Sequence, residues 1–291
     1  MHVLILGAGY SGTAIARAMA PTATSVVGTT RTGEKAMKLE KAGIRPILFD
    51  GETVSDELAA ALGQATHLIQ SIAPGRDGDP MFRASSPDLA QLAPNLKWIG
   101  YLSTVGVYGD HGGAWVTEDM LRKPVSARSV ERVEAEDGWI AFGVRQNIPV
   151  AVLRLAGIYG PGRNAFCNLA NGTARRLIKP GQVFNRIRVE DIGAATLFLA
   201  TSGTGGVFNI TDDEPAPPQD VVAEAARLMG VEPPPEIPFE QAELSPMARS
   251  FYGENKRVSN ARMRATGFAF AYPNYRVSLA QLWQSGTWRN A

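Results

Sequence analysis

The chain has 291 residues, of which 45% are apolar and 20% charged, with 29 Lys and Arg against 28 Asp and Glu. A formal net charge of +1 without a basic block gives no basis for a nucleic-acid partner or a membrane surface. Cys167 is the only cysteine, which excludes an internal disulfide and a cysteine-built metal site, and three scattered histidines indicate no metal centre.

The N-terminal residues predict a strand, a tight turn and a helix, in that order. The apolar run 3–6 enters Gly-x-Gly-x-x-Gly, and residues 13–20 have helical composition. In such a loop the first glycine permits the turn, the second lets a pyrophosphate approach the backbone, and the third lets the helix pack on the strand. Free N–H groups and the positive end of the helix then face the phosphates. We predict dinucleotide binding, with a ligand-free tight turn as the alternative, and the predicted contacts are Gly7, Gly9, Tyr10, Ser11 and Gly12.

Strands and helices alternate along the chain that follows. Short apolar runs predict strands at 25–30, 46–50, 67–72, 98–103, 150–155 and 207–210. Helices are predicted at 34–42, at 55–62 with Ser55 as the cap, and at 190–201. This alternation is typical of βαβ units, so we predict an α/β protein with a doubly wound parallel sheet. No apolar run reaches the roughly 18 residues of a membrane helix, and the first one enters the glycine loop too early for a signal peptide, so we expect a cytoplasmic protein.

Glycine and proline mark two changes of organisation. Residues 160–162 (Gly-Pro-Gly) open an insertion, and the proline-rich stretch 214–238 leads into a mainly helical C-terminal part. We therefore predict a dinucleotide-binding domain and a smaller, mainly helical substrate lobe over the carboxyl ends of the strands. The predicted domain comprises 1–160 and about 185–213, and the predicted lobe comprises 161–184 and 214–291.

The end of the second strand indicates which dinucleotide is bound. NAD-binding folds usually place Asp or Glu there to hydrogen-bond the ribose 2′-hydroxyl, whereas this chain has Thr29 and Thr30 followed by Arg31. A guanidinium beside hydroxyls can clamp a 2′-phosphate that a carboxylate would repel. The sequence favours NADP, with NAD still open and a solvated loop arginine as the alternative for Arg31. Asp50 ends the third strand and could accept a bond from the adenine amino group or cap the following loop.

Further motifs follow the glycine loop in a recognisable order. They are 102–109 (Leu-Ser-Thr-Val-Gly-Val-Tyr-Gly), 153–163 (Leu-Arg-Leu-Ala-Gly-Ile-Tyr-Gly-Pro-Gly-Arg), 185–191 (Asn-Arg-Ile-Arg-Val-Glu-Asp) and 207–210 (Val-Phe-Asn-Ile). With them the chain resembles the extended short-chain dehydrogenases/reductases, the NAD-dependent epimerase/dehydratase family. The resemblance covers about residues 1–230 and implies a Rossmann fold and oxidoreductase or epimerase chemistry. The C-terminal motifs resemble an atypical subgroup.

The resemblance implies roles for several positions. Thr104 would hydrogen-bond the reacting substrate oxygen, and residues 71–73 (Ser71, Ile72 and Ala73) would border the cofactor ribose. The family's acid/base Tyr and its helper Lys, one helical turn apart, fall here on Arg128 and Arg132. A guanidinium stays protonated, so Arg128 cannot shuttle a proton, while Arg132 could still hold the ribose.

Substitutes for the missing tyrosine are few. Tyr108, close to Thr104, could act as the acid or could be a packing aromatic. Histidine is a common acid/base residue, but His111 lies in a glycine-rich turn typical of a solvated histidine. Tyr252 and Lys256 have the spacing of the family's pair but occur outside the expected helix, so we interpret them as coincidence. The acids that follow the Thr in family dehydratases are also missing, which disfavours simple dehydration.

Arginines gather in the segments that face substrate in relatives. Converging guanidinium groups suit a phosphate or a carboxylate, and pairing with nearby loop acids is the alternative. The candidates for substrate binding are Arg154, Arg163 and Arg186, and Arg188 belongs to the same group. We expect a small-molecule substrate, no nucleic-acid or membrane partner and no metal, and the chain could form a homodimer.

Two functions remain open at this point. The first is a reductase or epimerase acting on a nucleotide-sugar-like or other anionic small molecule. The second is a catalytically inactive cofactor-binding or redox-sensing protein that acts through a partner. Loss of the tyrosine favours the second, and the retained Thr104, Tyr108 and arginines favour the first.

Overall fold

The computed structural model describes residues 1–85 and 88–289, and for 246–248 it describes the backbone alone. The chain divides into two compact units. Unit 1 comprises 1–107, 124–154 and 192–208, and unit 2 comprises 108–123, 155–191 and 209–291. Unit 2 thus takes four segments that the sequence prediction gave to the dinucleotide-binding domain: 108–123, 155–160, 185–191 and 209–213.

Local pairing explains why three of these segments, 108–123, 155–160 and 185–191, belong to unit 2. Strand β6 (Trp115–Val116) pairs with β13 (Arg257–Val258), and β8 (Gly157–Tyr159) pairs with β10 (Arg186–Arg188). These short strands satisfy their backbone groups within unit 2, and the large sheet does not contain them.

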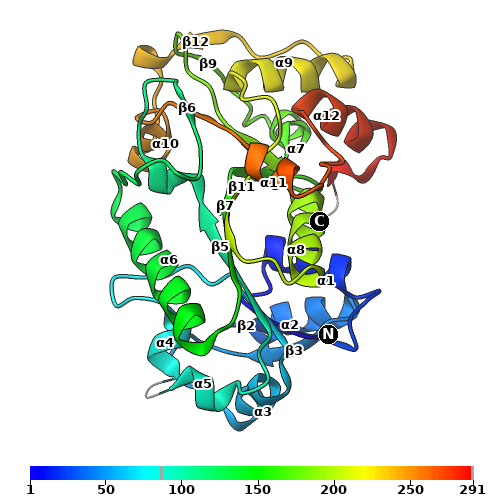
Figure 1. Ribbon diagram of the computed structural model, residues 1–291. Coiled ribbons are helices and arrows are strands. Elements are labelled where there is room, and N and C mark those ends of the chain that lie inside the picture. The colour runs from blue at the N-terminus through cyan, green and yellow to red at the C-terminus, as the bar shows by residue number, and fades with distance from the viewer. Residues whose placement is uncertain (86–87, 290–291) are drawn as a thin grey trace. The chain divides into compact units, whose positions relative to one another are not determined.

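A seven-stranded parallel sheet with the order β11-β7-β5-β4-β1-β2-β3 forms the centre of unit 1 (Figure 1). Its strands are β1 (His2–Leu6), β2 (Ser25–Thr30), β3 (Arg45–Leu48), β4 (His67–Gln70), β5 (Trp98–Thr104), β7 (Val150–Leu155) and β11 (Gly206–Ile210). The register places Leu4 against Leu68 and Leu6 against Gln70. The chain order reverses between β1 and β4, so the carboxyl ends of these two strands form the switch point at which doubly wound sheets bind ligands.

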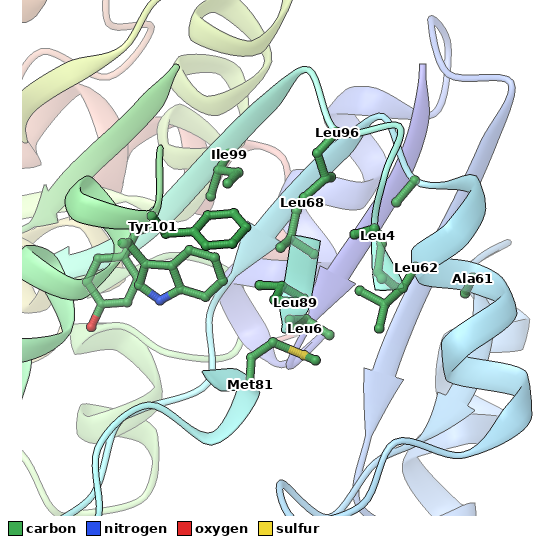
Figure 2. Close-up of a cluster of buried hydrophobic side chains, with 14 of the residues drawn as sticks. Leu4, Leu6, Ala61, Leu62, Leu68, Met81, Leu89, Leu96, Ile99 and Tyr101 are labelled. Carbon is green, nitrogen blue, oxygen red and sulfur yellow. The ribbon is translucent and has the colours of Figure 1, made fainter. Parts of the chain in front are cut away.

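One face of the sheet packs against four helices: α3 (Asp56–Gln64), α4 (Pro80–Ala84), α5 (Leu89–Leu92) and α6 (Ala127–Gln146). Strand residues such as Leu4, Leu68 and Ile99 meet Leu62 of α3 and Trp139 of α6 in a single buried cluster (Figure 2). Each fully buried aliphatic side chain stabilises the fold by about 1.5–3 kcal/mol relative to exposure. This cluster therefore accounts for much of the sheet's stability.

The opposite face of the sheet packs against α1 (Tyr10–Met19), α2 (Gly33–Lys41) and α8 (Val189–Thr201). A Cβ on Gly193 of α8 would lie 2.7 Å from the carbonyl oxygen of Ala14, so α8 and α1 approach at backbone distance. A Cβ on Gly28 would lie 2.7 Å from Ala8 and 3.7 Å from Leu39 of α2. Small residues thus set the spacing on this face.

The helix boundaries follow from their capping residues. Ser55 accepts the N–H of Leu58 at 3.2 Å and begins α3, which confirms the predicted cap. Ser126 begins α6 by accepting the N–H of Ser129, and Asn147 ends it in the left-handed region with φ 53°. None of the described helices is both long enough and apolar enough to cross a membrane.

A buried ion pair fixes α6 on the sheet within unit 1. The Arg154 guanidinium of β7 donates to both carboxylate oxygens of Glu136, at 3.1 and 2.7 Å, and Ser103 of β5 donates to the same carboxylate at 2.5 Å. Glu136 is 0% exposed and Arg154 is 4% exposed. Because both charged groups are removed from water, each needs the opposite charge of the other to offset the free-energy cost of its desolvation.

Unit 2 combines short two-stranded sheets with helices. Besides the pairs already given, β9 (Arg176–Ile178) pairs with β12 (Glu236–Pro238). Its helices are α7 (Ala165–Ala170), α9 (Pro218–Met229), α10 (Pro246–Phe251), α11 (Ala261–Ala265) and α12 (Tyr275–Gln284), and its 3-10 turns are η2 (Phe239–Gln241) and η3 (Thr287–Arg289). A separate core forms around Phe166, Leu279 and Trp288. Unit 2 therefore has its own hydrophobic centre.

Removing one partner of the buried ion pair should destabilise the protein strongly. Arg154→Met leaves Glu136 buried without its guanidinium, and we expect the free energy of unfolding to fall by about 3–5 kcal/mol in a urea titration. The matched control is Arg227→Met, which breaks an exposed pair with Glu224 and should cost at most about 1 kcal/mol. Equal losses in the two variants would contradict the role assigned to the buried pair.

Candidate dinucleotide and substrate sites

The three glycines of the N-terminal loop have three different environments. Gly7 has φ +84°, which side-chain-bearing residues rarely adopt, and a Cβ there would lie 2.8 Å from Cγ1 of Ile72. A Cβ on Gly12 would lie 2.9 Å from the carbonyl oxygen of Gly7 and 3.2 Å from Ile5. A Cβ on Gly9 would meet nothing within 4 Å. Gly7 and Gly12 are therefore required by the protein itself, whereas Gly9 faces open space that a ligand can fill.

The amino end of α1 provides no anionic group of its own. Gly9 is its N-cap and forms no side-chain cap bond, and the first turn, which contains Tyr10 and Ser11, has no acidic residue. Backbone N–H groups and the helix dipole leave partial positive charge at such an end. The open space at Gly9 and this charge fit a dinucleotide pyrophosphate.

The end of β2 supports the loop and presents a free cation. Thr29 Oγ1 accepts the N–H of Gly7 at 2.8 Å, which ties the turn to β2. Thr30 is 8% exposed. The Arg31 side chain is exposed and has no partner among the residues that the structure describes. A guanidinium at this position can reach a ligand without first breaking an ion pair.

Asp50 caps the loop that follows β3. Its Oδ1 accepts the N–H groups of Glu52 at 2.8 Å and Thr53 at 3.2 Å. These bonds lower the pKa of the exposed Asp50 carboxyl. The geometry supports the loop-cap interpretation, and contact with adenine stays a prediction.

A buried polar network positions the segment after β4. The Ser71 N–H donates to the carbonyl of Leu6, and Gln70 Oε1 accepts the N–H of Ile72 at 3.1 Å. The Gln70 amide donates to Asp79 at 2.7 Å, and Trp139 of α6 donates to the other carboxylate oxygen at 3.0 Å. Ile72 thus lies against Gly7, and Ala73 is exposed beside it.

The sequence analysis did not single out Gln70 or Asp79. Both side chains are buried, at 0% and 5% exposure, and burial raises the pKa of the Asp79 carboxyl. The sequence signal that could have identified Gln70 is a polar residue at the end of an otherwise apolar strand. Its partner lies nine residues further on, so their contact became visible only in the structure.

The two arginines that the resemblance aligned with the family's proton-transfer pair lie on α6. Arg128 is exposed, and Arg132 is half-buried and donates to the carbonyl of Leu102 in β5. Thr104, at the end of β5, accepts the N–H of Gly106 at 3.1 Å through Oγ1. The Thr104 hydroxyl proton remains available, because this bond uses only the acceptor side of the oxygen.

Tyr108 ends the 3-10 turn η1 (Val105–Tyr108) and is fully buried. Its hydroxyl donates to Oδ1 of Asn209 at 2.7 Å within unit 2. This contact favours a structural role over the proton-donating role that the sequence suggested. Lys256 is also buried and donates to the carbonyl of Gly109 at 2.7 Å and to Glu254, which gives it a structural role as well.

The three candidate substrate arginines have different surroundings. Arg154 pairs with Glu136, because residues two apart on a strand share a face and Val152 of β7 already packs beneath α6. The sequence analysis had placed Arg154 toward the substrate, with pairing to a loop acid as the alternative. The structure instead pairs Arg154 with Glu136 of helix α6. Arg163 is exposed, and Arg186 lies half-buried in β10. Arg163 and Arg186 belong to unit 2 and Arg154 to unit 1.

The site combines a glycine turn at the switch point of a doubly wound sheet, a helix amino end without a side-chain cap, and open space at the second glycine of the turn. These features define a dinucleotide-binding α/β protein of the Rossmann type. No family model matches the chain. Among characterised relatives, Protein YeeZ of Escherichia coli strain K12 is 31% identical over 288 residues, which cover 94% of this chain and 96% of YeeZ. The chain belongs to the extended NAD-dependent epimerase/dehydratase family.

A more distant relative and solved structures agree with this assignment. A 3-diazoavenalumate denitrifying reductase of Streptomyces sp is 24% identical, covering 97% of this chain and all of that protein. A functionally unknown conserved protein from Silicibacter pomeroyi DSS is 45% identical with a TM-score of 0.88 and 98% coverage of both chains.

Two enzymes solved with NAD share the fold at lower identity. The dTDP-glucose 4,6-dehydratase of Bacillus anthracis str. Ames is 18% identical with a TM-score of 0.75, covering 98% of this chain and 95% of its own. The UDP-glucuronic acid 4-epimerase of Bacillus cereus is 18% identical with a TM-score of 0.73 and 97% coverage of both.

Gly9→Val should abolish dinucleotide binding and leave the fold intact. The new side chain meets no protein atom near its Cβ but occupies the space at the amino end of α1. We expect the Kd for NADH and NADPH to rise about 100-fold or more in a fluorescence titration, with an unchanged melting temperature.

Two further glycine variants serve as controls for Gly9→Val. Gly63→Val, also with a loosely packed Cβ position, should bind as the wild type does. Gly12→Val should lower the melting temperature, because the Cβ of the new side chain would clash with the carbonyl oxygen of Gly7. Retained cofactor binding in folded Gly9→Val would disprove the phosphate-loop assignment.

Proposed function

We propose that this chain is a reductase or epimerase that uses NADP or NAD and acts on a nucleotide-sugar-like or other anionic small molecule. The observation that carries the proposal is the open space at Gly9, at the uncapped amino end of α1 and at the switch point between β1 and β4. Membership of a family with NAD-dependent epimerases and dehydratases supports the chemistry.

In this proposal the glycine loop and Arg132 hold the cofactor, which supplies a hydride acceptor or donor when bound. Gly9 and the amino end of α1 would hold the pyrophosphate, Gly7 and Gly12 would shape the turn, and Arg132 would contribute a positive charge near the ribose. Arg31 selects NADP in this proposal, because its guanidinium is exposed and has no partner among the described residues, and no carboxylate stands at the end of β2 to repel a 2′-phosphate. The structural neighbours were solved with NAD, so the preference for NADP is our own inference from Arg31.

Thr104 is the residue of this chain that we assign to the reacting substrate oxygen. Its oxygen accepts the Gly106 N–H, which orients the hydroxyl and leaves its proton to donate to a substrate carbonyl or hydroxyl oxygen. Neither Arg128 nor Arg132 can exchange a proton near neutral pH, so a water molecule moves the proton in this proposal. Without the tyrosine, we expect this enzyme to have a lower kcat than a relative that carries both the Tyr and the Lys of the proton-transfer pair.

The second candidate function is a cofactor-binding protein without turnover that signals redox state through a partner. The specific observation in its favour is α6, where Arg128 is exposed and Arg132 is engaged with the Leu102 carbonyl. Both candidates require dinucleotide binding. A turnover screen across nucleotide sugars and aldehydes with NADPH and NADH separates them, since the second predicts binding without turnover.

Arg31→Asp should shift cofactor preference from NADPH towards NADH. Loss of charge-assisted bonds to the 2′-phosphate, worth about 1.5–3 kcal/mol, should weaken NADPH binding about 10- to 100-fold, whereas the Kd for NADH stays close to its original value. Arg17→Asp, an exposed charge reversal late in α1, should leave the ratio of the two affinities unchanged. An unaltered ratio in Arg31→Asp would contradict the 2′-phosphate assignment.

Thr104→Val and Tyr108→Phe should affect different properties. With any substrate that the screen identifies, Thr104→Val should lower kcat about 100-fold and keep the Kd for the cofactor. Tyr108→Phe should mainly lower the free energy of unfolding, by about 1–3 kcal/mol, because Oδ1 of Asn209 loses its donor. A folded Tyr108→Phe protein without turnover would instead identify Tyr108 as the general acid, and full activity in Thr104→Val would remove Thr104 from the mechanism.

A further inference from the structure

Arg132 of α6 keeps its charge free of an ion pair, although an acid lies one helical turn away. Arg132 and Glu136 have the i, i+4 spacing at which opposite charges on a helix usually pair. Glu136 instead accepts from Arg154 at 3.1 and 2.7 Å and from Ser103 at 2.5 Å. Arg132 forms no ion pair with an acid in the described part of the chain. Its charge therefore remains available to a ligand.

Neutral groups of β5 hold the Arg132 guanidinium. It donates to the carbonyl of Leu102, and the hydroxyl of the preceding residue, Tyr101, faces the same side chain. Ser103, the next residue along the strand, bonds Glu136 on the following turn of α6. Consecutive residues of β5 thus fix the register of α6 on the strand and the place of Arg132 along it.

The Tyr101 hydroxyl has no alternative to Arg132. Tyr101 is 0% exposed, and its ring lies at the edge of the buried cluster that contains Trp139, with the oxygen directed away from the apolar side chains (Figure 2). Apart from the facing Arg132, no described residue offers this oxygen a hydrogen bond. A buried hydroxyl without a partner is unfavourable, so this oxygen stabilises a guanidinium that stays beside it.

Tyr101 holds the guanidinium without cancelling its charge. Burial raises the pKa of the Tyr101 hydroxyl, against the opposing charge of Arg132, and the Asp79 charge raises it further. The phenol is therefore neutral near pH 7 and acts as an acceptor dipole. A carboxylate in its place would hold Arg132 as well but would neutralise the charge that a ligand needs.

We propose that Tyr101 is a positioning residue for the cofactor: with the Leu102 carbonyl, its hydroxyl holds Arg132 in place to bind the nicotinamide ribose. Arg132 touches the ribose in this arrangement, and Tyr101 acts only through Arg132. The inference rests on the proposed function, which assigns Arg132 to the ribose. All three residues belong to unit 1.

Thr104 indicates which ribose of the dinucleotide is meant. It ends β5, two residues after Leu102, and is the residue assigned to the reacting substrate oxygen. Because a hydride passes only between adjacent atoms, the nicotinamide half of the cofactor has to bind near this end of β5. A guanidinium that is already held there loses less conformational entropy when ribose hydroxyls bind it. Tyr101 thus contributes to affinity without a ligand contact of its own.

The test compares two probes, NADH and ADP, in isothermal titration calorimetry of the full-length protein. NADH carries the nicotinamide ribose, whereas ADP carries only the adenosine and phosphate part that the glycine loop would bind. Tyr101→Phe removes one oxygen and keeps the ring in the cluster with Trp139. We expect its Kd for NADH to rise about 3- to 10-fold and its Kd for ADP to stay unchanged. A merely structural role would weaken both.

A double-mutant cycle with Arg132→Met shows whether Tyr101 acts through Arg132. Arg132→Met alone should raise the Kd for NADH about 10- to 100-fold, as expected for the loss of charge-assisted hydrogen bonds. Adding Tyr101→Phe to it should weaken NADH binding no further. Tyr275→Phe changes a buried tyrosine in the separate core of unit 2, and this matched control should bind both probes as the wild type does.

Three results would overturn the role of Tyr101: unchanged NADH affinity in Tyr101→Phe, equal weakening of NADH and ADP, or additive losses in the double variant. Arg132→Met leaves the buried cluster untouched, and its binding NADH as the wild type does would also overturn the proposal. Failure of the proposed function is seen separately. A wild type that binds neither NADH nor NADPH removes both ideas, whereas NADH binding that Tyr101→Phe leaves unaffected removes only the positioning role.

Discussion

The close approach of α1 to the end of β1 is the constraint on which the rest of unit 1 depends. Gly12 permits this approach, since any Cβ there would press on the Gly7 carbonyl, and Gly7 turns the chain with a positive φ. The amino end of α1 is thereby held at the switch point, beside Ile72 of the segment after β4. Packing thus decides where the positive end of the helix lies, and Gly9 leaves that end open.

Two buried polar side chains hold helix α6 in place within unit 1. Its inner face carries Trp139 and Glu136, which bind Asp79 and Arg154 and so connect α6 to the network after β4 and to the sheet. Its first turns carry Arg128, which is exposed, and Arg132, which donates to the carbonyl of Leu102. In our proposal these arginines stand in place of the relatives' proton-transfer pair, and a water molecule moves the proton.

The arginines of unit 2 differ in how many of their donor nitrogens form hydrogen bonds with described residues. Arg188 has its charge neutralised by Glu190 and its donor nitrogens occupied, whereas Arg186 bonds, among the described residues, only through Nη1, to the carbonyls of Phe184 and Ala216. The complete pairing of Arg188 favours a structural role for this side chain. The same physical argument assigns Arg154 to stability, since its partner Glu136 already satisfies it.

The sequence by itself determined the doubly wound sheet and the glycine loop. These features depend on local patterns: an apolar strand before Gly7 and helical composition after Gly12. The replacement of the proton-transfer tyrosine by Arg128 stays a prediction from the resemblance. Only the tertiary structure decided that Arg154 is buried against Glu136 and that Tyr108 donates to Asn209. The physical reason is that β7 is buried on both faces and has no polar alternation to show which way Arg154 points, and the partners of Arg154 and Tyr108 lie 18 and 101 residues away along the chain.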